Sequence, residues 1–244
     1  MNTKIDVTYD MRLDSNNDDP DGYSLTLAKC HQKIWSKKLP NGRNLELEID
    51  IDDDKRYIFK GLVDGKEIIF SSDIIATTYS DGWSRFPISK EIIPNIPEKI
   101  VDEFDLFAHT IGAFIIFPKR MKNGNTINQA RGINSEIYDR FDLTLECIRR
   151  QYSGIENPLT ETLTRYADYF NLFNGFKEYC QFFLLQDLVS NDYKEVRFHL
   201  PFNGFEKNPL PKSLIEYASF RESCIEFVKL RNKRIFEYYE STNA

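Results

Sequence analysis

The chain has 244 residues, of which 41% are hydrophobic and 14% aromatic, which is enough for one large core or two small ones. Its net charge is −6, and the only long segment with a basic excess is 119–150, which has seven basic and four acidic side chains. The charge therefore argues against a broad surface for duplex DNA, but it leaves room for a compact site for one phosphate group or a short single strand.

Several classes of protein and site are disfavoured by what the sequence lacks. The four cysteines are far apart and predict reduced core thiols, and the acidic start of the chain is not a signal peptide. No apolar run reaches the length of a membrane span. Three scattered histidines and the absence of a phosphate-binding glycine loop predict no metal and no cofactor. A cytoplasmic protein is the resulting expectation.

The first part of the chain predicts an antiparallel meander that follows an irregular start at residues 1–22. Asn41-Gly42 and Asp64-Gly65 are typical hairpin turns. Alternating or β-rich segments predict the strands Tyr23–Leu27, Asn44–Ile51, Tyr57–Val63 and Lys66–Phe70. Proline-rich residues 84–100 predict a linker to the rest of the chain.

The stretch from Phe107 to Tyr152 is the one around which the chain is organised. Gly112–Phe117 predicts a buried strand, and the polar Lys119–Gly132 predicts a loop. A helix is then expected to begin after Asn134 or Ser135 and to run to Tyr152.

The charged residues of that expected helix fall into two groups. One group predicts a solvated face, with magnesium binding by its carboxylates as an alternative; its members are Asp139, Asp142, Glu146, Arg149 and Arg150. Arg140 instead lies on the flank of the apolar side, so it requires a carboxylate, a carbonyl or a ligand anion.

The last part of the chain predicts mainly helices. We expect helices after Asn157, at Phe176–Val189 and at Lys212–Tyr239, with a strand at Val196–Leu200. Arg231 falls inside the buried stripe of the last helix, where it needs either a carboxylate partner or a shared anion pocket. The fold class is therefore α+β, with a β-rich region at 1–99 and a mainly helical region at 100–244.

The best candidate for a ligand site is the segment Asn128-Gln129-Ala130-Arg131-Gly132. Its backbone amides and Arg131 could bind an anion, with Arg140 and Arg231 as further cations. His109 is the best general base, although a structural role is the alternative. Ser71–Asp73 and Ile34–Gly42 are further candidate site loops, with capping or turn formation as the simpler role for Ser71.

Two resemblances bear on function. Arg231-Asn232 is similar to the start of the HEPN ribonuclease motif, but Phe236 stands where that motif has its histidine. The strings WSKKLPNG, HTIGAFIIFP, TINQARG, DRFDLTLECIRRQY and FFLLQDLV resemble an uncharacterised bacterial family, a domain of unknown function, from Trp35 to about Ile235. That resemblance implies an intracellular bacterial protein and brings no known activity.

Two functional hypotheses follow. The first is a protein that binds or processes a phosphate-bearing ligand, a nucleotide or short single-stranded RNA, in an arginine-lined pocket. The second is a non-catalytic interaction protein, such as a toxin–antitoxin or phage-defence partner, with Phe236, Tyr238 and Tyr239 as an exposed aromatic patch. A purely structural role for every charge is the third reading.

Overall fold

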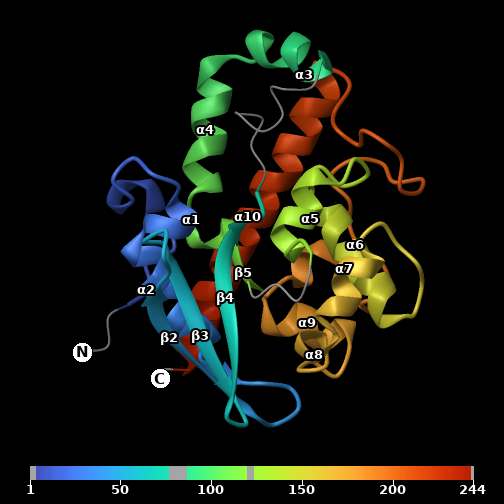
Figure 1. Ribbon diagram of the computed structural model, residues 1–244. Coiled ribbons are helices and arrows are strands. Elements are labelled where there is room, and N and C mark those ends of the chain that lie inside the picture. Colours follow the sequence, from blue (N-terminus) through green and yellow to red (C-terminus); the bar gives the residue numbers. More distant parts are fainter. Residues whose placement is uncertain (1–3, 77–86, 120–123, 243–244) are drawn as a thin grey trace.

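The computed structural model describes residues 4–76, 87–119 and 124–242, and it has an α+β fold. In Figure 1 the sheet lies at the lower left and helices α5 to α9 lie to its right. The last helix, α10, runs from the top of the view to the bottom, and its lower part passes behind the sheet. The α+β prediction is confirmed.

The sheet is an antiparallel meander in the order β1-β2-β3-β4-β5. β1 to β4 follow one another along the chain, whereas β5 arrives after a helical excursion and pairs with the second half of β4, Ser71 opposite Phe117. The predicted β-rich region therefore shares its sheet with a strand from the predicted helical region. The strands are β1 Lys37–Lys38, β2 Asn44–Ile51, β3 Tyr57–Val63, β4 Lys66–Ile74 and β5 Phe114–Pro118.

Both predicted hairpin turns are present. Asp64 and Gly65 adopt φ values of 51° and 73°, which is the left-handed pair that a two-residue hairpin needs. Gly42, with φ 86°, turns the chain between β1 and β2. β2 alternates buried and exposed residues over its first half, so the sequence period of two places Leu45 and Leu47 in the core.

The helices surround this sheet. Within the described residues, no helix is long and apolar enough to cross a membrane. Part of the predicted linker lies outside the described residues, and the rest forms short helices. The α-helices are α1 Pro20–Tyr23, α2 Leu25–Trp35, α3 Pro87–Ile92, α4 Glu98–Ala108, α5 Ile127–Ile133, α6 Phe141–Tyr152, α7 Thr160–Arg165, α8 Ala167–Phe170, α9 Phe176–Phe182 and α10 Leu214–Thr242; the 3-10 turns are η1 Met11–Asp14, η2 Ile93–Asn95, η3 Ile111–Ala113 and η4 Gln186–Leu188.

The predicted strand at Tyr23–Leu27 is wrong, because this segment joins two helices. Ser24 ends α1 and also caps α2, since its hydroxyl accepts a hydrogen bond from Leu27 N at 3.0 Å. A serine at the start of an apolar run satisfies a free helix amide, and this local bond prevails over the alternation.

The single helix predicted from residue 134 to Tyr152 is also wrong. The chain forms α5 first, fixed by a capping box in which Thr126 and Gln129 bond each other's backbone amides. Tyr138 and Asp139 then take φ values of 44° and 61°, which interrupt the helix. Arg140 has an extended backbone and stands immediately before α6. The predicted loop at Lys119–Gly132 is therefore partly helical.

Two predictions near the C-terminus need similar correction. The helix expected at Phe176–Val189 ends at Phe182, and Leu184 has φ 56°. The strand expected at Val196–Leu200 is reduced to one bridge between Val196 and Val189. The last helix, by contrast, is present as α10.

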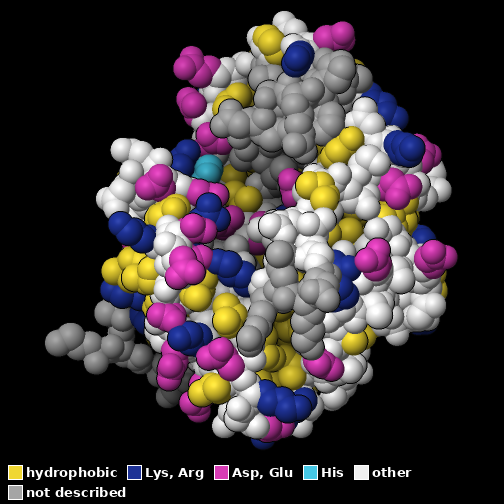
Figure 2. Space-filling view, in the orientation of Figure 1, with side chains coloured by type: hydrophobic (Ala, Val, Ile, Leu, Met, Phe, Trp, Pro, Cys, Tyr) yellow, Lys and Arg dark blue, Asp and Glu magenta, His cyan; other side chains and the backbone are white. Residues whose placement is uncertain are grey.

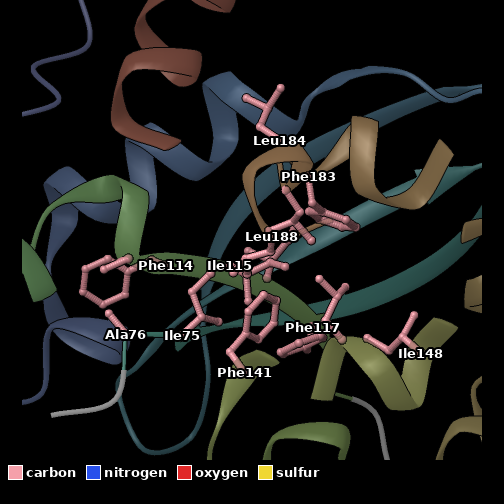
Figure 3. Close-up of a cluster of buried hydrophobic side chains, with 14 of the residues drawn as sticks. Ile75, Ala76, Phe114, Ile115, Phe117, Phe141, Ile148, Phe183, Leu184 and Leu188 are labelled. Atoms are coloured by element: carbon pink, nitrogen blue, oxygen red, sulfur yellow. The ribbon is translucent and has the colours of Figure 1, made fainter. Parts of the chain in front are cut away.

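The core is centred on β5, which is buried along its whole length. Figure 3 shows Phe114, Ile115 and Phe117 of this strand among side chains from the segment directly after β4, from α6 and from the segment after α9. A strand that is buried on both faces reads as a continuous apolar run, which explains why the sequence identified it. The sheet and the helical half therefore share one hydrophobic core.

Candidate functional site

A polar cleft of about 200 Å³ lies between α1, the middle of the sheet and the start of α5. We call it the Asp21 cleft. Its lining residues are Asp19, Asp21, Gly22, Tyr23, Arg56, Tyr57, Ile58, Ser71, Ser72, Lys119, Thr126, Asn128 and Gln129. It therefore brings together the predicted Asn128 and Gln129 with Ser71 and Ser72 of the predicted site loop.

Local sequence features place these side chains. Asp19 caps α1 by accepting the amide of Asp21 at 3.2 Å, and Pro20 occupies the first helical position. That short turn directs Asp21 toward β4, where its Oδ2 accepts the amide of Ile74 at 3.1 Å. On the other side of the cleft, the capping box of α5 fixes Gln129.

A chain of hydrogen bonds runs from the core to this cleft. The Trp35 indole donates to His31 Nδ1 at 2.9 Å, so neutral His31 carries its proton on Nε2. Nε2 lies 3.0 Å from Ser72 Oγ, and Ser72 in turn donates to Asp21 Oδ1 at 3.1 Å. Burial lowers the pKa of His31 to about 3, so the ring is neutral at neutral pH.

A second carboxylate stands behind the first. Asp73 is buried and accepts Arg131 Nη1 at 2.8 Å, while Arg131 Nε donates to Thr144 Oγ1. Burial, and then the charge of Asp73, raise the pKa of Asp21 well above its ordinary value. Because Asp73 has the arginine, we assign the negative charge of the pair to Asp73.

The Asp21 cleft also contains cations. Lys119 forms an ion pair with Asp52, and Arg56 lies beside Tyr23, whose hydrogen bond raises the pKa of Arg56. The cleft therefore combines two kinds of group: carboxyls and hydroxyls, and cations and side-chain amides. On the face seen in Figure 2, acidic and basic side chains are intermingled and do not form one basic patch.

The three predicted arginines do not share one pocket. Arg131 is 1% exposed and is held by Asp73 and by the Asp139 backbone. Arg140 bonds Asp142 Oδ1 at 3.2 Å and the Pro209 carbonyl at 2.6 Å, and it lines a separate hollow of about 240 Å³. The arginine-lined pocket of the first hypothesis is therefore not formed by these residues.

Arg231 is fully buried and held by backbone oxygens. Its guanidinium donates to the carbonyls of Gly112 and Phe114 at 2.7 Å and to Phe183 at 3.1 and 3.2 Å. Among the residues that the structure describes, no carboxylate forms an ion pair with it. The partners that a buried guanidinium needs are thus carbonyls, one of the possibilities that the sequence raised for Arg140.

His109 lies at the end of α4, away from the Asp21 cleft lining. Its Nδ1 is 2.7 Å from the Asp105 carbonyl, four residues earlier. The structure thus gives His109 a local backbone partner, and its role as a general base stays a prediction.

The solvated face expected for α6 is wrong at two positions. Asp142 and Glu146 are 0% and 4% exposed. Asp142 is bound by Arg140 and by the amide of His199, and Glu146 by Arg149 and Arg150. These bonds occupy two of the three carboxylates that the magnesium alternative required.

The comparisons with known proteins agree with the resemblance seen in the sequence. A family of unknown function (DUF6994) matches residues 5–235. The chain belongs to this family. No curated protein and no solved structure matches it. The DUF6994 match spans every residue of the hydrogen-bond chain, but it carries no activity that could be transferred to the cleft.

Sequence reasoning missed Asp21, His31 and Arg56 as site residues. The signals were weak: an Asp-Pro pair that begins a helix, and a histidine four residues before a tryptophan in a helical segment. Ser72 was inside a predicted site loop, but nothing in the sequence pairs it with a histidine 41 residues earlier.

Proposed function

We propose that the chain binds a small phosphate-bearing ligand of the nucleotide class in the Asp21 cleft. The observation that carries this proposal is that one hollow of about 200 Å³ contains both carboxyls with hydroxyls and cations with side-chain amides. A free nucleotide and the terminal nucleotide of a short RNA both present a phosphate and ribose hydroxyls, which match these two kinds of group.

The cations and the side-chain amide suit the phosphate. Arg56 offers a planar fork of donors, Lys119 a point charge and Asn128 a side-chain amide. Asn128 is half-buried, and no hydrogen bond from its amide to another described residue competes with a ligand. The carboxyl of Asp21 and the hydroxyl of Ser71 suit ribose hydroxyls.

In this proposal the predicted arginines act indirectly. Arg131 neutralises Asp73 behind the cleft, whereas Arg140 and Arg231 stabilise the fold. Arg56 and Lys119, in place of the three predicted arginines, are the groups that contact the ligand.

Calorimetric titration with AMP, ribose 5-phosphate and inorganic phosphate tests the proposal. We expect Arg56→Ala to weaken AMP binding about tenfold or more, because a hydrogen bond to a charged group contributes about 1.5–3 kcal/mol. Lys60→Ala is the matched control, since Lys60 is a cation on β3, the strand that begins directly after Arg56, and it lies outside the cleft and pairs with Asp50. Absence of binding by all three compounds, or equal weakening by both substitutions, would overturn it.

The interaction-protein hypothesis has less support from the aromatic residues on which it relied. Phe236, Tyr238 and Tyr239 are half-buried. Lys4 Nζ lies 5.0 Å above the Phe236 ring and Lys37 Nζ lies 4.3 Å above the Tyr238 ring. Because lysines of the chain itself cover these two rings, we favour the cleft, and a toxin–antitoxin or phage-defence role stays a prediction.

A further inference from the structure

We propose that Asp21 is the acid–base residue of the cleft and that its carboxyl group exchanges a proton with the bound ligand. This inference rests on the proposed ligand binding in the Asp21 cleft and goes beyond it, because it assigns proton transfer to a named residue.

The direction of the chain is set at its buried end. An indole N–H can only donate, so the nitrogen of His31 that faces Trp35 accepts. Neutral His31 then has its proton on Nε2 and donates it to Ser72 Oγ, 3.0 Å away. The single hydroxyl proton of Ser72 is therefore left for Asp21 Oδ1, 3.1 Å away. His31 cannot act as a base toward Ser72 in this arrangement, which excludes a nucleophilic serine of the usual kind.

The same bonds leave room for a proton on the carboxyl group of Asp21. Oδ1 accepts the Ser72 hydroxyl at 3.1 Å and Oδ2 accepts the Ile74 amide at 3.1 Å, so each oxygen uses one lone pair and keeps a second. Asp21 lines the cleft and is half-buried, so a proton held at one of these remaining lone pairs can reach a ligand.

The charged groups around Asp21 favour a proton there. Behind it, Asp73 holds the negative charge opposite Arg131, with Asp139 near the same guanidinium. Next to it on the chain, Asp19 is occupied by the Asp21 amide, and on the same helix Tyr23 lies beside Arg56. Lys119 also lines the cleft. Burial and the charge of Asp73 raise the pKa of Asp21, which agrees with the assignment.

The proton transfer is balanced without a further reactant. The carboxyl O–H bond of Asp21 breaks as the proton bonds to a basic oxygen or nitrogen of the ligand. The carboxylate that remains keeps its two donors, the Ser72 hydroxyl and the Ile74 amide. The reverse step takes a proton from a ligand hydroxyl, so the same residue serves as acid and base.

Carboxyl NMR of protein labelled with ¹³C at aspartate tests the proposal. We expect two aspartates, Asp21 and Asp73, to titrate above the ordinary range. The signal of Asp21 should disappear in Asp21→Asn and remain in Asp19→Asn, the matched cleft carboxylate outside the hydrogen-bond chain. Saturating AMP should move the midpoint of Asp21. Ser72→Ala should move the midpoint further upward in the free protein, because Oδ1 loses the donor that stabilises its charge.

The imidazole ¹⁵N spectrum gives a readout that needs no ligand. We expect His31 to remain neutral with its proton on Nε2 across this titration, whereas a proton on Nδ1 would overturn the proposal. An Asp21 midpoint in the ordinary range, or one that stays fixed while AMP binds, would also overturn it. If none of the three compounds binds, the proposed function falls, and the assignment for Asp21 is decided by the titration and the tautomer alone.

Discussion

At the scale of single residues, the molecule places ionisable side chains where water does not reach. His31, Arg131, Asp142 and Arg231 are each at most 1% exposed. Each has hydrogen-bond partners from other elements or from its own turn, as buried polar groups require. Because these ionisable groups are buried, the free energy of unfolding depends on pH and on their hydrogen-bond partners.

The buried ring of His31 predicts a loss of stability in acid. Its folded pKa of about 3 is below the value of an unfolded histidine, so between about pH 6.5 and pH 3 only the unfolded state takes up the proton. His31→Gln should therefore reduce the slope of unfolding free energy against pH by about 1.4 kcal/mol per pH unit in this range.

Urea unfolding at pH 6.5, 5.5 and 4.5 measures that slope. Comparison with wild type isolates His31, because the contributions of Asp21 and His199 are common to both proteins. Gln32→Ala, on the same helix α2, is the control, because glutamine does not titrate, and it should keep the wild-type slope. Equal slopes for wild type and His31→Gln would contradict the buried neutral ring.

Substitution of Arg231, whose hydrogen-bond partners are carbonyl oxygens, should cause a large loss of stability. Arg231→Ala leaves the carbonyls of Gly112, Phe114 and Phe183 without their donor and opens a cavity, so we expect a loss of about 4 kcal/mol or more. Chemical unfolding measures it. Lys233→Ala, on the exposed face of the same helix, should change stability by about 0.5 kcal/mol or less. A loss below about 1 kcal/mol for Arg231→Ala would argue against the carbonyl contacts.

At the scale of elements, α10 lies close against η3. Asn232 accepts the Gly112 amide at 2.7 Å and donates to Thr110 Oγ1 at 2.8 Å. A methyl group at Gly112 would lie 2.7 Å from the Val228 carbonyl and 2.6 Å from Asn232 Oδ1. The absence of a side chain at this position is what allows the helix to approach.

Gly112→Ala should therefore destabilise the protein by about 1–3 kcal/mol, because the obstacle includes backbone that cannot rotate away. Gly22→Ala is the control: its methyl would lie 3.0 Å from the flexible Arg56 side chain, and an alanine suits a helix. Thermal unfolding of the two variants compares them. Equal melting temperatures would show that α10 can shift at little cost.

The elements also show what the sequence could predict. The hairpins depend on Asn-Gly or Asp-Gly pairs and on alternation, which are local, and they are present as expected. The break before α6 depends on Tyr138 and Asp139 adopting left-handed backbone, which their residue types do not announce. The bond between His31 and Ser72 joins an α-helix to a strand across 41 residues, so no local pattern could indicate it. The burial of Arg231 was predicted correctly, but its carbonyl partners come from two distant segments.

At the scale of the whole molecule, one core holds all four cysteines. Each is buried, and burial raises the pKa of Cys30 to about 11 and the pKa of the other three thiols still further above the ordinary value. The predicted reduced core thiols agree with this burial. They come from four different helices, so their accessibility reports on the molecule as a unit.

We therefore expect no rapid reaction of the native protein with a thiol reagent such as DTNB at pH 8, and four reactive thiols in guanidinium chloride. The reaction rate in increasing urea should follow global unfolding, because the reactive thiolate forms only when the core opens. One thiol that reacts at once in the native state would show that part of the core opens separately.

The contacts of Arg231 also bear on how the chain reaches its native state during synthesis. The three carbonyls that it binds belong to residues made 48 to 119 positions earlier. Until the ribosome has released α10, those oxygens have no donor from it, and β5 lacks the helix that packs behind it. A product of premature termination upstream of residue 231 would thus remain incompletely folded and accessible to proteases. We expect it to be degraded.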